Sequence, residues 1–271
     1  MKRCLLGTFS SLAFWKSISA FVRRRRQSVR QYYDAWTDRY LDSFGDVFQA
    51  ARAERDEDLI AYFVRMAGIE DGMRVLDAGC GVCGPSIRIA QIADVKIDAV
   101  TISPVQADLA RQRVRESGLS DKIKVHLGDY SELGAMFGHD CFDRIIFLES
   151  LCHAKRLGKV AGECRDVLRK GGQVYVKDFY RKHHSDPARK AWADVVSSRV
   201  EREFRCNVRE VSAVRAALAE AGLEEVTCRP IGFELSEFFM EKFATTNQIN
   251  IFEGGERVDW CEWLELSYKK T

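Results

Sequence analysis

Proline and long uncharged apolar runs are both scarce in this chain of 271 residues, which contains only four prolines. Hydrophobic residues make up 46% and charged residues 30%, a composition that excludes collagen-like and low-complexity disordered chains. No segment is apolar and long enough to predict a transmembrane helix. The length suits one α/β domain with appendages better than two equal domains.

The nine cysteines lack the regular spacing of a disulfide or zinc framework. Cys80 and Cys83 form a CxxC pair, but no second pair follows, so we predict no metal site there. A secretory signal pattern is also lacking. These observations predict reduced thiols and a cytoplasmic location.

Acidic residues are absent from residues 1–33, which hold eight of the 42 Lys and Arg residues. The rest of the chain therefore carries 34 basic and 40 acidic residues. A nucleic-acid partner needs basic residues spread over a face, so this balance argues against one.

Within residues 4–22, apolar residues recur at steps of three or four, which predicts a helix with one apolar stripe. The run of arginines at 23–26 would end it. Three alternatives remain for this extension, taken as residues 1–30. It docks on its own domain or a sister subunit, lies on a membrane surface, or is an organellar transit peptide. We favour the first, and with it a homo-oligomer.

Short apolar, β-branched segments alternate with helical patterns through residues 31–271, which predicts a Rossmann-like α/β domain. We expect a seven-stranded, mostly parallel sheet with helices on both faces. The expected strands are Arg74–Ala78, Lys96–Ile102, Ile123–Leu127, Phe142–Leu148, Gln173–Phe179, Glu225–Pro230 and Trp263–Tyr268. The expected helices include Asp56–Met66, Pro104–Ser117, Arg156–Leu168 and Val208–Glu220. Residues 232–258 contain five phenylalanines and are predicted to form an aromatic cap.

A glycine-rich turn, Gly79-x-Gly81-x-x-Gly84, directly follows the first predicted strand. Such a turn lets the backbone approach an adenosine-bearing ligand closely. Asp77 would repel a pyrophosphate but can pair with the ammonium of an amino-acid ligand. The second strand ends in Thr101 and Ser103 instead of the acid that a dinucleotide site prefers. The pattern therefore favours S-adenosylmethionine over NAD.

The segment from Val75 to Gly84 resembles the V-L-D-x-G-C-G-x-G-G motif of class I methyltransferases, except that Cys83 replaces a glycine. Gly128-Asp129-Tyr130 and Val167-Leu168-Arg169-Lys170-Gly171-Gly172 match later motifs of that family. The resemblance covers about residues 30–230. It implies cofactor contacts from Asp77, Gly79, Gly81, Gly84, Thr101, Gln106, Asp129 and Tyr130.

Three further segments are similar to methyltransferases that act on alkene carbon. Tyr32-Tyr33-Asp34, followed by Phe44–Gln49, and Glu149-Ser150-Leu151-Cys152-His153-Ala154 are similar to segments of the sterol C-methyltransferases. Thr101-Ile102-Ser103 with Gln106 looks like the T-x-S-x-x-Q of cyclopropane fatty-acid synthases. This resemblance implies Glu149, His153 and Tyr33 as catalytic residues. We expect the substrate to contact Tyr33, Trp36, Phe48, Phe179, Arg181, Phe238 and Phe239.

Alkene methylation puts positive charge on carbon, so its site needs a carboxylate, aromatic faces and a base. Glu149 and His153, four residues apart, would share one side of a helical turn. The basic run after the fifth predicted strand, residues 181–184, suits an anionic substrate such as the prenyl diphosphates of bacterial terpenoid methyltransferases. Magnesium would then accompany the diphosphate, whereas no DDxxD motif for ionising it is present.

We therefore expect C-methylation of an isoprenoid alkene, either a prenyl diphosphate or a prenylated natural product, with proton loss from the resulting cation. Two alternatives remain open: O- or N-methylation of a small metabolite, and a non-catalytic S-adenosylmethionine-binding assembly subunit.

Overall fold

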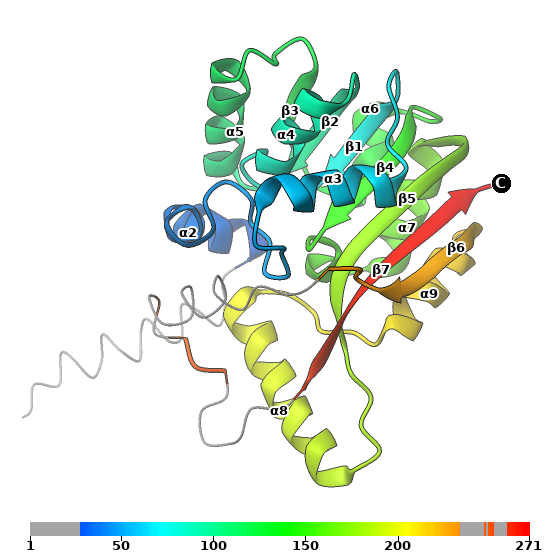
Figure 1. Ribbon diagram of the computed structural model, residues 1–271. Helices are drawn as coiled ribbons and strands as arrows, with labels where there is room; N and C mark the ends of the chain where they lie inside the picture. The colour runs from blue at the N-terminus through cyan, green and yellow to red at the C-terminus, as the bar shows by residue number, and fades with distance from the viewer. Residues whose placement is uncertain (1–27, 234–246, 248, 252–258) are drawn as a thin grey trace, which may run out of the picture.

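A seven-stranded sheet forms the centre of the computed structural model, which describes residues 28–233, 247, 249–251 and 259–271 (Figure 1). Its strands are β1 (Arg74–Ala78), β2 (Lys96–Thr101), β3 (Ile123–Leu127), β4 (Phe142–Leu148), β5 (Leu168–Arg181), β6 (Leu223–Pro230) and β7 (Cys261–Lys270). They lie in the order β3-β2-β1-β4-β5-β7-β6. The first five are parallel, and β7 runs antiparallel to both of its neighbours. The predicted mostly parallel, Rossmann-like sheet is confirmed.

Helices cover both faces of this sheet. Successive side chains of a strand point to opposite faces, and both faces carry apolar side chains that need to be buried. In β4, Ile145 and Phe147 join the core beneath α7 and α9, whereas Ile146 and Leu148 join the core beneath α3, α4 and α5. The helices are α2 (Val29–Phe44), α3 (Asp56–Ala67), α4 (Gly84–Ile92), α5 (Pro104–Glu116), α6 (Leu133–Phe137), α7 (Leu157–Val167), α8 (Pro187–Phe204) and α9 (Val211–Glu220), with short 3-10 turns η1 (Tyr130–Glu132) and η2 (Leu151–His153).

Several bounds differ from the sequence expectations. The predicted helix 156–168 ends at Val167, because Leu168 already pairs with Phe142 at the start of a longer β5. The predicted helix 208–220 starts at Val211. Helix α8 was not predicted, since charged and polar residues interrupt its apolar residues and leave no continuous apolar stripe. Its start signals, an Asp186 cap before proline, were nevertheless present in the sequence.

Helix α2 begins at a capping box, in which Ser28 and Gln31 bond each other's backbone. It packs against α5, and its Asp34 carboxylate accepts a 2.6 Å hydrogen bond from the Ser103 hydroxyl after β2. In Figure 1, α2 and α8 lie beside the sheet on the side away from the chain's C-terminus. The two helices thus flank the carboxyl ends of the parallel strands, where open α/β sheets bind ligands.

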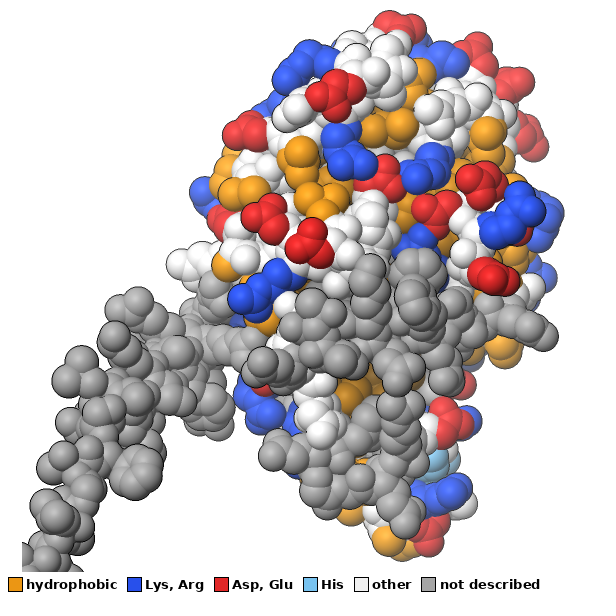
Figure 2. All heavy atoms as spheres, turned by 60° about the vertical axis from the view of Figure 1, so that its left-hand side comes forward, with side chains coloured by type: hydrophobic (Ala, Val, Ile, Leu, Met, Phe, Trp, Pro, Cys, Tyr) orange, Lys and Arg blue, Asp and Glu red, His pale blue; other side chains and the backbone are white. Residues whose placement is uncertain are grey.

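Positive and negative side chains are interspersed on the face shown in Figure 2, where the described residues form no single continuous basic patch. This agrees with the charge balance of the sequence. Within the described residues no helix is both long and apolar enough to cross a membrane. The predicted helix in residues 4–22 and most of the predicted cap at 232–258 lie outside the described residues.

Candidate active site

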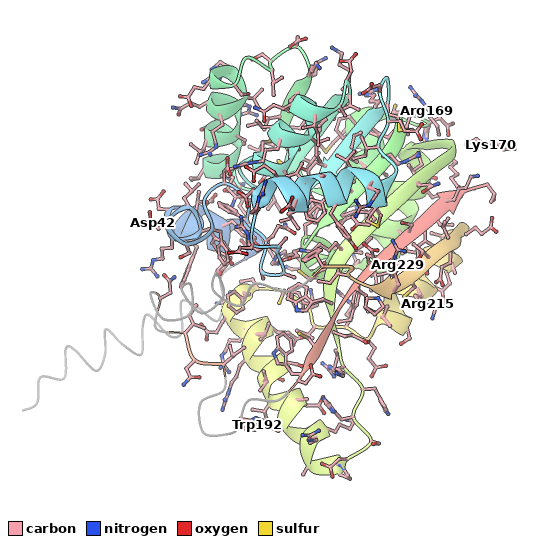
Figure 3. The ribbon with its side chains drawn as sticks, in the orientation of Figure 1. Asp42, Arg169, Lys170, Trp192, Arg215 and Arg229 are labelled. Atoms are coloured by element: carbon pink, nitrogen blue, oxygen red, sulfur yellow. The ribbon has the colours of Figure 1, made fainter. Side chains whose placement is uncertain are left out.

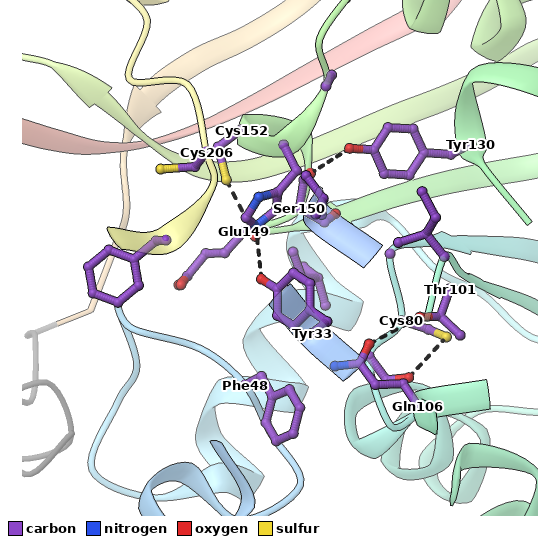
Figure 4. Close-up of a pocket in the computed structure, with 18 of the residues that line it drawn as sticks. Tyr33, Phe48, Cys80, Thr101, Gln106, Tyr130, Glu149, Ser150, Cys152 and Cys206 are labelled. Atoms are coloured by element: carbon purple, nitrogen blue, oxygen red, sulfur yellow. Dashed lines mark hydrogen bonds between the residues drawn. The ribbon is translucent and has the colours of Figure 1, made fainter. Parts of the chain in front are cut away.

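One cavity of about 570 Å³ lies at the carboxyl ends of β1, β2, β4 and β5. Most of the predicted site residues line it, although they come from segments as far apart in the chain as Tyr33 and Phe179. Asp77, Gly79, Gly81, Thr101, Gln106, Asp129 and Tyr130 line one part. Tyr33, Phe48, Glu149, His153 and Phe179 also line it. Figure 4 shows Thr101 and Gln106 at the right of the view and Tyr33 and Glu149 nearer its centre.

The glycines of the turn are required by close contacts within the protein as well as by the space of the cavity. A Cβ on Gly84 would lie 1.9 Å from the Asp46 carbonyl oxygen, and one on Gly79 would lie 2.5 Å from Ser150 Cβ. Gly81, which has φ +54°, borders the cavity. Cys83 has φ 63°, a left-handed conformation that glycine adopts more easily than cysteine, and the family motif has glycine at this position. Gly84, which was predicted to contact the cofactor, does not line the cavity. Its missing side chain instead lets the 45–52 loop pack closely against the turn.

Asp77 ends β1 as a buried carboxylate, 2% exposed, whose Oδ2 accepts a 2.5 Å hydrogen bond from the Ser86 hydroxyl. Burial raises the pKa of Asp77 to about 6, and the Ser86 hydrogen bond partly counters this rise. A buried acid that lines a cavity suits a cationic ligand group, and the predicted pairing with an ammonium stays a prediction.

Gln106 supplies a second polar contact for a ligand. Its Oε1 accepts a 3.1 Å hydrogen bond from Thr101, while its buried Nε2 has no hydrogen-bond partner among the described residues. Burial of a hydrogen-bond donor without a partner costs free energy, which an acceptor on a bound ligand, such as a ribose hydroxyl, would recover. Together with Asp77, this orphaned donor matches the groups of S-adenosylmethionine.

Tyr130 and Asp129 follow β3, beside the same cavity. The Tyr130 hydroxyl donates to the Ser150 carbonyl at 2.9 Å, and the Asp129 carboxylate caps η1 by accepting from Ser131 N at 2.8 Å. Both residues line the cavity, and their contact with the cofactor stays a prediction.

Tyr33 and His153 form a hydrogen-bonded pair, with 2.9 Å between the Tyr33 hydroxyl and His153 Nε2. His153 Nδ1 lies 3.0 Å from the Arg205 carbonyl oxygen, which can only accept, so Nδ1 carries the proton. Burial lowers the pKa of His153, and the neutral ring therefore accepts the Tyr33 proton at Nε2. The sequence predicted both residues but not their contact, which joins α2 to η2.

Glu149 lies directly after β4 with φ 56° and precedes the 3-10 turn that contains His153. The expectation that these two residues share one side of a helical turn is therefore wrong. The Glu149 carboxylate is bonded by the backbone amides of Ala50 (2.6 Å) and Ala51 (3.0 Å) and by the Lys177 ammonium. The candidate catalytic carboxylate is thus an ion-paired group.

Other predicted substrate residues lie away from the cavity. Trp36 is buried and stacks on Tyr32. Arg181 donates to the Val208 carbonyl and pairs with Asp194, so the expected role of the basic run is not supported at that position. Its neighbours Lys182 and His184 bond Asp259. Phe238 and Phe239 lie outside the described residues.

The structure adds lining residues that the sequence analysis missed. They include Arg30, Tyr40, Phe44, Cys152, Lys155, Arg156, Val200, Phe204, Cys206, Trp260 and Trp263. Phe204 ends α8, a helix that was not predicted, and Cys206 follows two residues later. The sequence pattern did not link Phe204 and Cys206 to a site, because only the packing of α8 beside β5 brings them to the cavity. Lys155 and Arg156, by contrast, closely follow the predicted His153.

Among the described residues, no cluster of three or more His, Cys, Asp or Glu side chains could hold a metal ion. The eight cysteines in the described part of the chain, Cys80 and Cys83 included, are free thiols.

The family model of mycolic acid cyclopropane synthetase matches residues 24–204, more than half of the chain. The chain belongs to this family. The expected class I S-adenosylmethionine-dependent methyltransferase is thereby confirmed. Sterol 24-C-methyltransferase erg-4 of Neurospora crassa is 32% identical over 165 residues, which cover 58% of this chain and 43% of the fungal protein.

Two solved structures share the fold. The [4+2]-cyclase SpnF aligns with a TM-score of 0.74 and 20% identity, covering 89% of this chain and 94% of that one. Geranyl diphosphate C-methyltransferase from Streptomyces coelicolor A3(2), in complex with Mg²⁺, geranyl diphosphate and S-adenosyl-L-homocysteine, aligns with a TM-score of 0.65 and 15% identity, covering 91% and 99%. The methyltransferase chain spans about half the length, or less, of the curated sterol relatives that it matches.

Proposed function

We propose that this methyltransferase transfers a methyl group to an alkene carbon of an isoprenoid substrate, most simply a prenyl diphosphate. The observation that carries the proposal is the single cavity that joins the Asp77–Gln106 side to an aromatic wall containing Glu149 and the Tyr33–His153 pair. Its volume of about 570 Å³ falls in the range of small-molecule sites, about 300–1,000 Å³.

S-adenosylmethionine, when bound, supplies an electrophilic methyl group. Asp77 would hold its ammonium and Gln106 Nε2 a hydroxyl, which leaves the Glu149 side of the cavity for the substrate. The Glu149 carboxylate stabilises positive charge that develops on the substrate carbon. The faces of Phe179 and Trp260, which meet edge to face at 5.8 Å, add cation–π attraction.

Proton removal falls to the Tyr33–His153 pair in this mechanism. The Tyr33 oxygen accepts a proton from the methylated cation while its own proton passes to His153 Nε2 across the 2.9 Å hydrogen bond. The Arg205 carbonyl, which accepts from Nδ1–H, stabilises the resulting imidazolium.

Lys155 and Arg156 support an anionic substrate in place of the predicted Arg181. Both are exposed, line the cavity just after His153, and have no ion-pair partner in the part of the chain that the structure describes. Arg30 lines the same cavity one helical turn before Tyr33, although it also lies 3.9 Å from Asp34. A diphosphate would satisfy these cations, and any magnesium would arrive with it.

Incubation with methyl-labelled cofactor and a panel of prenyl diphosphates, the corresponding alcohols and a sterol tests the proposal by mass spectrometry. A diphosphate product with one added methyl carbon is expected. Labelled methyl ethers of the alcohols would favour the O-methyltransferase alternative. Cofactor binding without any labelled product would favour the assembly subunit.

Variants at the two cations test the substrate charge. Lys155→Ala with Arg156→Ala should raise KM for the diphosphate at least tenfold, the cost of losing charge-assisted contacts, and leave an accepted alcohol unaffected. Lys170→Ala is the matched control, because this exposed lysine lies far from α2 and α8 (Figure 3). Equal KM values for all variants would refute an anionic head group at this position.

A further inference from the structure

Lys177 is a fully buried cation in β5, next to Leu148 of β4. Its ammonium donates to Gln49 Oε1 at 2.9 Å, to the Ala51 carbonyl and to Glu149 Oε1. The aromatic rings of Phe63, Phe233 and Trp263 surround it at 5.5 to 5.8 Å from their centroids. A buried lysine in this environment keeps its charge only if a counter-ion stays beside it.

Glu149 is that counter-ion, and its side chain is only 8% exposed. Glu149 lines the cavity, whereas Lys177 does not, so the ion pair presents its negative end to the substrate. Three donors already occupy the carboxylate: the amides of Ala50 and Ala51 and the Lys177 ammonium. Such a carboxylate is a well-oriented fixed charge.

Other charged groups near the pair come from several elements. Arg52, in the loop before α3, interacts favourably with Glu149 but is itself paired with Asp56. Asp178, the neighbour of Lys177, has its pKa raised to about 7 by burial and by the Glu149 charge. Burial also raises the pKa of the Cys152 and Cys261 thiols, which stay neutral. Lys177 is therefore the cation in direct contact with Glu149.

We propose that Lys177 is a positioning residue, which keeps Glu149 ionised and aimed at the cavity so that the carboxylate stabilises the substrate cation without accepting its proton. This inference rests on the proposed alkene methylation. Without Lys177, the buried carboxylate would bind a proton near neutral pH and lose its charge.

A purely structural ion pair would give a different result, because the same contacts also fix the Phe48–Ala51 loop. Lys177→Met would then damage the enzyme equally at every pH. If Lys177 instead acts through the charge of Glu149, its loss should be repaired when high pH ionises the unpaired carboxyl group.

The test compares Lys177→Met, Glu149→Gln and the double variant in full-length protein, with turnover measured relative to wild type from pH 6.5 to 9. We expect Lys177→Met to lose about 10²-fold at pH 6.5 and to recover at least tenfold by pH 9. In the Glu149→Gln background, the same change should alter turnover by less than about threefold at any pH, because neighbours acting through one group are not additive.

Infrared difference spectra between Lys177→Met and the double variant report the Glu149 proton without any substrate. A protonated-carboxyl band should appear near neutral pH only in Lys177→Met. This band would persist even if no isoprenoid is methylated, so the two proposals fail separately. A pH-independent loss, equal losses in both backgrounds, or an absent band would overturn the role of Lys177. If Lys177→Met does not fold, a double variant slower than Glu149→Gln alone would overturn it as well.

Discussion

Acidification from pH 7 to pH 5 should weaken S-adenosylmethionine binding about tenfold through one side chain, Asp77. This carboxyl group is 2% exposed, and burial raises its pKa to about 6. Only its ionised form pairs with the ligand's ammonium. With this pKa, about nine-tenths of Asp77 is ionised at pH 7 and about one-tenth at pH 5. The tenfold difference corresponds to about 1.4 kcal/mol.

Asp77→Asn separates charge from shape, because an amide oxygen can still accept the Ser86 hydrogen bond. The variant should bind the cofactor about 10- to 100-fold more weakly at pH 7, the usual cost of about 1.5–3 kcal/mol for a hydrogen bond to a charged group. It should also lose the pH dependence. Calorimetric titrations at pH 5, 6 and 7 measure both effects, since the α-amino group stays mostly protonated there.

The raised pKa of Asp77 also makes the stability of the ligand-free protein depend on pH. Rising pH strengthens cofactor binding but lowers the free energy of unfolding. The folded pKa of about 6 exceeds the ordinary value of 3.8, so stability from this group is complete below about pH 4 and lost as pH rises through 6. The loss is about 3 kcal/mol. Asp77→Asn should therefore raise the unfolding free energy at pH 7 but not at pH 4. If wild type and variant lose affinity in parallel on acidification, another group titrates and the role of Asp77 is refuted.

Three further predictions concern packing, proton transfer and assembly. Gly84→Ala should destabilise the fold by about 1–3 kcal/mol, because its Cβ would meet backbone at 1.9 Å, whereas Gly162→Ala, with open space in α7, should stabilise it by about 1 kcal/mol in thermal unfolding. Tyr33→Phe should lower the single-turnover rate of formation of the deprotonated, methylated product about 10²-fold with cofactor affinity kept, and an unchanged rate would exclude a relay to His153. Deletion of residues 1–25 should leave a folded domain but change its mass in sedimentation, because an apolar stripe usually has a protein partner.

The sequence by itself determined the number of strands and their places along the chain, the turn after β1 and many residues that line the cavity. Those features depend on local signals: apolar runs of strand length, glycines where φ is positive, and a charged residue at a strand end. The places of Asp77 and Gln106 at the cavity could be predicted because each residue belongs to a short continuous motif at the end of a strand. Glu149, His153 and Tyr33 were found through short matching segments, without their contacts.

Only the tertiary structure decided which side chains form an ion pair and which form a hydrogen bond along which a proton can pass. Tyr33 meets His153 and Glu149 meets Lys177 across separations of 120 and 28 residues, which no periodicity encodes. Arg181 looked like an anion ligand at a strand end, but Asp194 of the unpredicted helix α8 neutralises it. A side chain's chemistry depends on the partners and solvent exposure that long-range packing gives it, and these determine whether a charge is free, paired or shifted in pKa.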